Sequence, residues 1–117
     1  METEHFENLV AEAMDRLPLS MGKKMENVSV CVEQRPSKEQ QKQLGMRRDE
    51  LLLGLYEGVP KAEWGRGFGG NLPDKITIFQ ESVERLAHSK KELVELIQDT
   101  VKHEIKHHFG FSEKDLS

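Results

Sequence analysis

Residues 89–109 read SKKELVELIQDTVKHEIKHHF, and this stretch predicts one long amphipathic helix around which the fold is organised. Ser89, followed three residues later by Glu92, forms a capping box, the sequence signature of a helix N-terminus. Apolar side chains then recur with helical spacing and form one broad face: Leu93, Val94, Ile97, Val101 and Ile105. Polar side chains are expected on the opposite side: Lys91, Glu95, Gln98, Asp99, Lys102 and Lys106. The apolar face therefore marks the part of the helix that packs against the rest of the protein.

The end of this helix contains the pattern His-Glu-x-x-His. Residues four apart lie one turn above each other, so His103 and His107 can point at the same ion. Glu104 stands beside the first histidine, where a general base for a metal-bound water would lie. Both histidines fall at the edge of the apolar face, next to Leu96 and Thr100. The pattern is typical of a catalytic zinc site, which has three protein ligands and one open position.

A third ligand is expected from the residues that follow the helix. Gly110 allows the chain to turn back, and the turn favours Glu113 as the ligand, with Asp115 as the alternative. His108 points about 140° away from His103, towards the apolar face. We therefore expect His108 to be a hydrogen-bonded core residue or a residue that supports the ligands from behind. The simpler alternative for the whole motif is a helix end whose histidines suit the macrodipole.

The rest of the chain alternates between helical and extended patterns. Residues 5–17 have helical spacing and end at Pro18, and residues 81–87 predict a short helix. Residues 38–48 are polar and predict a short helix or an ordered loop. Strands are expected at residues 27–33, where Val28, Val30 and Val32 share one face, at residues 50–56 and at residues 75–79. Residues 57–74, rich in glycine and proline, predict a long loop.

Length and composition restrict the class of protein. With 117 residues, the chain can build one hydrophobic core, so residues 1–117 are expected to form a single domain. The net charge is −4 and basic residues are scattered, which argues against a nucleic-acid partner. No apolar run is long enough to span a membrane, and no signal-peptide pattern opens the chain. The single cysteine, Cys31, fits a reducing cytoplasm.

Three blocks of sequence carry a family resemblance: LGLYEGVP at residues 53–60, LPDKI at residues 72–76 and HEIKHHFG at residues 103–110. The chain resembles the minimal zincin-like metallopeptidases, a family of small bacterial proteins. The resemblance implies an α+β fold in which a small β-sheet packs against the motif helix, with Zn²⁺ in a cleft between them. It also implies His103 and His107 as ligands and Glu104 as the catalytic base. Where the family commonly has aspartate, this chain has Glu113, which is longer by one methylene.

These observations lead to a zinc-dependent metallopeptidase as the expected function. The alternative is a non-catalytic metal-binding or protein-interaction module that keeps the fold, and Glu104 argues against it because such a module needs no base. A peptide or protein substrate is expected to pair with an exposed edge strand, for which residues 75–79 are the candidate. Tyr56 is a candidate for stabilising the oxyanion, although a packed tyrosine is the competing interpretation.

Overall fold

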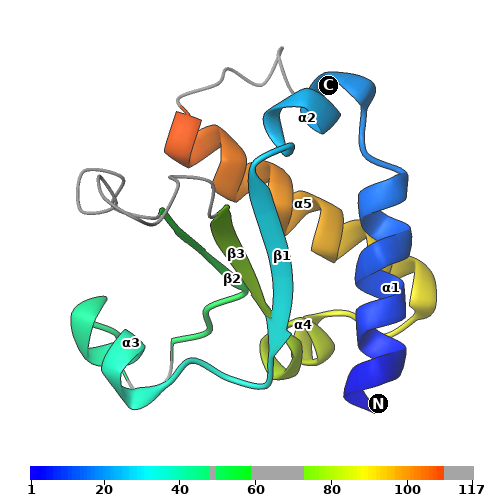
Figure 1. Ribbon diagram of the computed structural model, residues 1–117. Coiled ribbons are helices and arrows are strands. Elements are labelled where there is room, and N and C mark those ends of the chain that lie inside the picture. The colour runs from blue at the N-terminus through cyan, green and yellow to red at the C-terminus, as the bar shows by residue number, and fades with distance from the viewer. Residues whose placement is uncertain (48–49, 59–72, 110–117) are drawn as a thin grey trace.

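A computed structural model describes residues 1–47, 50–58 and 73–109, which form an α+β fold around a three-stranded mixed sheet (Figure 1). The elements, in chain order, are α1 (Thr3–Asp15), α2 (Leu19–Lys24), β1 (Val28–Glu33), α3 (Lys38–Gln43), β2 (Gly54–Glu57), β3 (Asp74–Phe79), α4 (Gln80–Leu86) and α5 (Lys90–Phe109). The expected α+β class is therefore confirmed. None of the helices in the described ranges is long and apolar enough to cross a membrane.

The sheet has the strand order β1–β3–β2, with β3 parallel to β1 and antiparallel to β2. Ile76 of β3 lies between Val30 of β1 and Tyr56 of β2. The prediction that residues 75–79 form an exposed edge strand is wrong, because β3 is hydrogen-bonded on both sides. Its last four side chains are also buried, as expected for a central strand. Among the described strands, β1 and β2 are the edges.

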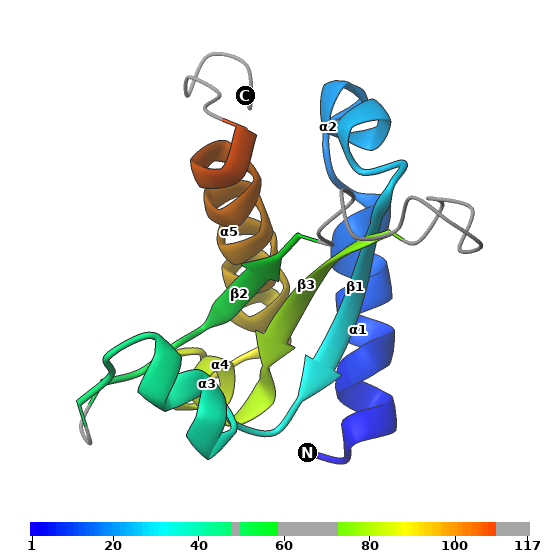
Figure 2. The same ribbon diagram turned by 60° about the vertical axis from the view of Figure 1, so that its left-hand side comes forward.

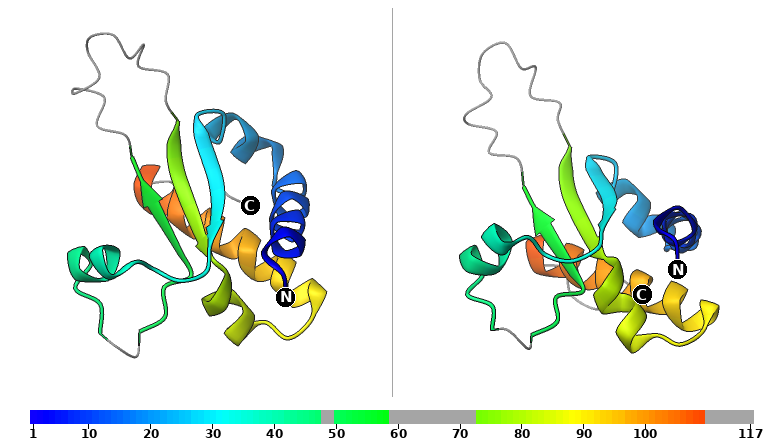
Figure 3. Two further views of the ribbon diagram at one scale, coloured as in Figure 1. Left: turned by 60° about the horizontal axis from the view of Figure 1, so that its bottom comes forward. Right: turned by 90° about the horizontal axis from the view of Figure 1, so that it is seen from below.

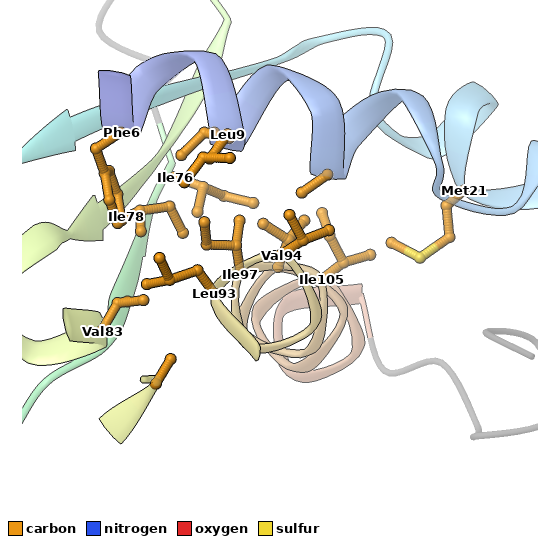
Figure 4. Close-up of a cluster of buried hydrophobic side chains, with 14 residues drawn as sticks. Phe6, Leu9, Met21, Ile76, Ile78, Val83, Leu93, Val94, Ile97 and Ile105 are labelled. Atoms are coloured by element: carbon orange, nitrogen blue, oxygen red, sulfur yellow. The ribbon is translucent and has the colours of Figure 1, made fainter. Parts of the chain in front are cut away.

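Helices α1 and α5 lie side by side on one face of the sheet, where α1 contacts β1 and α5 contacts β2 and β3 (Figures 2 and 3). The side chains between these layers form the core (Figure 4): Phe6, Leu9, Val10, Ala13, Met21, Ile76, Ile78, Val83, Ala87, Leu93, Val94, Ile97, Val101 and Ile105. All five apolar side chains expected on one face of α5 belong to this core, so that prediction is confirmed. The three valines of β1 pack against the same core.

The N-terminus of α5 is fixed by hydrogen bonds close to those the sequence predicts. The Ser89 hydroxyl accepts a hydrogen bond from the Glu92 backbone N–H at 3.1 Å. The Glu92 carboxylate accepts one from the backbone N–H of His88, the residue before the expected cap, also at 3.1 Å. From this start, α5 continues for 20 residues, or about 30 Å. Its last fully buried side chain is Ile105, so the end of the helix extends past the core.

A close approach between β2 and α5 sets the position of the helix. At Gly54, an added Cβ would lie 2.6 Å from Thr100 Cγ2 and 3.2 Å from the carbonyl oxygen of Thr77. Any side chain at this position would push the strand and the helix apart. Glycine therefore allows β2 to pack directly against the turn of α5 that leads into His103.

Two local predictions differ from the structure. The first helix ends at Asp15, and the unpredicted helix α2 begins directly after Pro18, whose carbonyl accepts a hydrogen bond from the Met21 N–H. Residues 50–53 precede β2 and form no strand, because β3 ends where α4 begins and offers them no partner. The last bond between these strands joins the Phe79 N–H to the Leu53 carbonyl. Most of the predicted loop at residues 57–74 lies outside the described residues.

Candidate metal centre

His103 and His107 occupy successive turns near the end of α5, and both side chains are exposed. Their rings lie nearly parallel, at 15°, with centroids 6.3 Å apart, so they point to the same side of the helix. Neutral imidazole nitrogens are preferred zinc ligands. The two histidines therefore fit two of the three protein positions of a catalytic zinc site.

Glu104 lies between the two histidines along the chain, and its side chain is half-buried. Burial raises the pKa of this carboxyl above its ordinary value, while the charges of His103 and His107 act in the opposite direction. A carboxylate with a raised pKa accepts a proton more readily than an exposed glutamate does. This property suits a general base at neutral pH.

All three side chains line one cleft of about 550 Å³ between α5 and the segment that leads into β2. We call this space the helix cleft, and its lining residues are Leu51, Leu52, Leu53, Gly54, Leu96, Asp99, Thr100, His103, Glu104 and His107. Its size is within the range of sites that bind small molecules or peptide side chains. As expected, Leu96 and Thr100 lie beside the histidines. The cleft has an apolar wall formed by leucines and a polar wall that carries the motif.

Asp99 is a cleft residue that the sequence did not single out. It was expected on the polar side of α5 and is exposed, and it also lines the helix cleft together with His103. The sequence did contain the signal, because Asp99 precedes His103 by four residues and such residues share one helix face.

The third metal ligand stays a prediction. Glu113 and Asp115 lie outside the described residues, as does Gly110. Within residues 1–47, 50–58 and 73–109, no three histidine, cysteine, aspartate or glutamate side chains come together in a way that could hold a metal ion. The described part of the chain therefore supplies two candidate ligands and a candidate base.

His108 is exposed, so the prediction of a core histidine is wrong. At this point α5 extends beyond the core, because Ile105 is its last fully buried side chain. The His108 ring instead stacks on the ring of Tyr56, with centroids 3.8 Å apart and an interplanar angle of 17°. This contact joins the last turn of α5 to β2.

Tyr56 in turn donates a hydrogen bond from its hydroxyl to Asp74 Oδ2 at 2.7 Å. Burial, together with this bond, raises the pKa of Tyr56 above its ordinary value. The hydroxyl proton is thus directed at Asp74, and stabilising an oxyanion would require that bond to open. Tyr56 also packs against the core, which favours the interpretation as a packed residue.

Asp74 was not anticipated from the sequence, and no local signal could have found it. It meets Tyr56 only because β2 and β3 pair with Tyr56 opposite Ile76, which brings the residue two positions before Ile76 within reach. Gly58 lies beside the same group, because a Cβ there would be 3.7 Å from His108 Cε1 and 3.8 Å from Asp74 Oδ1. These residues form a joint between β2, β3 and the end of α5.

A family model described as zincin-like metallopeptidase matches residues 25–117 of the chain. The matched range includes the whole sheet, α4 and α5, and it leaves out α1 and α2. A search of curated proteins found no match.

Proposed function

Because the chain belongs to the zincin-like metallopeptidase family, we propose that it is a zinc-dependent peptidase whose active site is the helix cleft. One observation carries the proposal: His103, Glu104 and His107 line the same cleft, and the two histidine rings lie nearly parallel on one side of α5. The arrangement combines metal-binding nitrogens with a half-buried carboxylate of raised pKa. This combination suits hydrolysis of a carbonyl compound by an activated water.

In this proposal each residue has one task. A bound zinc ion would lower the pKa of a water molecule and polarise the carbonyl of the peptide bond. His103 and His107 would hold the ion. Helix α5 fixes the positions of these two residues, because the same helix is buried through Ile97, Val101 and Ile105. Glu104 takes a proton from the attacking water and passes it to the leaving amine. Glu113 is proposed as the third ligand.

The peptide substrate is proposed to lie along β2, the edge strand that borders the helix cleft. The Phe79 N–H bonds to the Leu53 carbonyl, and antiparallel pairs alternate. The backbone groups of Gly54 and Tyr56 are therefore expected to point away from β3, where an extended peptide can pair with them. This assigns the role of edge strand to β2 in place of β3. We also propose a cytoplasmic location, because Cys31 is a free thiol.

The competing function is a metal-binding or interaction module without catalysis. Such a module would keep the two histidines but would have no use for Glu104 beside them, half-buried in a cleft. Glu104 therefore separates the two proposals.

The test measures zinc content and peptide hydrolysis together for the wild type, Glu104→Gln and the control Glu95→Gln, an exposed glutamate on the same helix. Glu104→Gln should keep its zinc and lose about 10²–10⁴-fold in hydrolysis rate, because only the base is removed. Glu95→Gln should keep both properties. Full activity in Glu104→Gln would overturn the catalytic assignment, and a wild type without stoichiometric zinc would overturn the metal site.

The third ligand has its own test. Glu113→Gln should lower zinc affinity far more than Asp115→Asn does, because only the first removes a ligand. A larger loss of zinc affinity in Asp115→Asn would identify Asp115 as the third ligand. Equal, small effects would show that neither carboxylate binds the ion.

A further inference from the structure

A second pocket of about 190 Å³ adjoins the helix cleft. Leu51 and Leu52 line both spaces, so the two border the same segment. We call it the arginine pocket, and its lining residues are Arg35, Pro36, Gln41, Met46, Arg47, Glu50, Leu51, Leu52, Glu81, Ser82 and Arg85. Its lining is mostly polar, in contrast to the leucine wall of the helix cleft. A ligand that extends along the cleft would therefore meet a polar environment at this end.

The charges of the arginine pocket do not cancel. Arg35 donates two hydrogen bonds to the Glu81 carboxylate, at 2.8 and 2.9 Å. Arg47 pairs with Glu50 at 3.9 Å. Arg85 forms no hydrogen bond and no ion pair with any residue in the described ranges. One positive charge thus remains unbalanced in the pocket, although the whole chain has a net charge of −4.

The pocket also holds a buried hydroxyl group that lacks a partner. Ser82, in the first turn of α4, is only 5% exposed, and it lines the pocket. Its hydroxyl forms no hydrogen bond within residues 1–47, 50–58 and 73–109. Buried polar groups in folded proteins nearly always have a hydrogen-bond partner. The pocket is the place from which a ligand can supply one.

We infer that the arginine pocket binds a carboxylate of the substrate, either an acidic side chain or the C-terminal carboxylate of a peptide. Arg85 supplies the charge and a planar pair of donors that matches a carboxylate, and Ser82 supplies a further donor. The inference rests on the proposed function, because it takes the peptide in the helix cleft as given. It adds a preference of the peptidase for acidic substrates.

The geometry also indicates where in the substrate the carboxylate lies. Gly54 approaches Thr100 and Tyr56 stacks on His108, so β2 and α5 run in the same direction. Leu51 and Leu52 therefore lie towards Leu96, about two turns of α5 before His103. Two turns correspond to about 10 Å, which about three residues of an extended chain span. The acidic residue is thus expected at least about three positions from the cleaved bond.

The test uses binding, so that it does not depend on hydrolysis. The probes are fluorescein-labelled alanine nonapeptides with a central leucine, in which one glutamate or one glutamine is moved through the positions. Each peptide is made with a free and with an amidated C-terminus. Their dissociation constants are measured by fluorescence anisotropy with zinc-loaded Glu104→Gln protein. The same measurement is made in the background of Arg85→Gln, Ser82→Ala and the control Arg16→Gln, an exposed arginine that does not line the arginine pocket.

At one position, the glutamate peptide should bind about tenfold or more tightly than the glutamine peptide. Arg85→Gln should abolish this difference and Ser82→Ala should reduce it, while Arg16→Gln should preserve it. If the peptides with a free C-terminus bind more tightly than the amidated ones, the pocket binds the C-terminal carboxylate of the peptide. Equal binding of all peptides, no binding at all, or an equal loss in Arg16→Gln would overturn the inference. Hydrolysis by the wild type without any preference for glutamate would leave the proposed function intact and reject this inference alone.

Discussion

The two ends of α5 differ sharply, although they belong to one continuous helix. Between Leu93 and Val101, Ile97 and Val101 are fully buried, and Leu93 and Val94 nearly so. In the last two turns, Ile105 is still buried, but the side chains of His103, His107 and His108 are exposed. The first part of the helix therefore supplies most of the folding energy, and the last turns present polar side chains to a cleft. A helix clamped at one end can position ligands at the other without using those ligands to hold the fold together.

The largest expected effect comes from the buried first part of α5. Ile97→Ala should lower the free energy of unfolding by about 2–5 kcal/mol, because it removes buried methyl groups and leaves a cavity between α1, α5 and the sheet. Glu95→Ala, an exposed change on the same helix, should alter it by less than about 0.5 kcal/mol. Chemical denaturation of the metal-free proteins measures both. Similar losses for the two variants would contradict the comparison.

A smaller effect is expected where β2 meets the helix. Gly54→Ala should cost about 1–3 kcal/mol in unfolding free energy, because the new Cβ would overlap Thr100 and displace α5 from the sheet. Gly22→Ala is the matched control, since Gly22 lies in α2 with no atom within 4 Å of an added Cβ. That control should be neutral or slightly stabilising. If Gly54→Ala is also neutral, the close approach does not set the helix position.

The joint between β2, β3 and the end of α5 should contribute least to the free energy of unfolding. Tyr56→Phe keeps the ring stacked on His108 and removes the hydrogen bond to Asp74, so a loss of about 1 kcal/mol is expected. Asp74→Ala should cost a similar amount, and the double variant should lose less than the sum. Strict additivity in denaturation measurements would show that the two residues do not act together.

The same bond gives a dependence on pH. The pKa of Tyr56 is raised in the folded protein, so the folded state holds this proton more tightly than the unfolded state does. The contribution to stability is complete below about pH 10, the unfolded value, and is lost as the pH rises through the folded pKa. Above about pH 10, the wild type should therefore lose stability faster than Tyr56→Phe. Parallel curves for the two proteins would exclude the raised pKa.

The elements that local sequence determines were predicted well. Helix α5, its serine cap and its apolar face all follow from residues close together in the chain, as does the face shared by the three valines of β1. The short helix α2 was missed because a proline predicts only the end of the preceding helix. Pro18 in fact stands at the start of the next one.

The features that depend on tertiary structure were not predicted. Polar and apolar side chains alternate in residues 75–79, and this pattern predicts a strand with one exposed face. In the structure, the polar side chain of Thr77 is buried as well, so β3 is buried on both faces. Helical spacing gave the direction of His108 but could not show that the core ends before it. The contact between Tyr56 and Asp74 required the strand register. For the site, the motif identified His103, Glu104 and His107, which line one cleft, whereas Asp99, which lines the same cleft, was not singled out.

The central claim is that the end of α5 binds metal and does not support the fold. The most direct measurement is thermal unfolding of the wild type, His103→Ala and His107→Ala, each with and without added zinc. Without zinc, the three melting temperatures should nearly coincide, because both side chains are exposed. With zinc, the wild type alone should melt at a higher temperature, because the ion binds only the folded state. A variant that melts well below the wild type without zinc, or that gains as much as the wild type from zinc, would contradict the account.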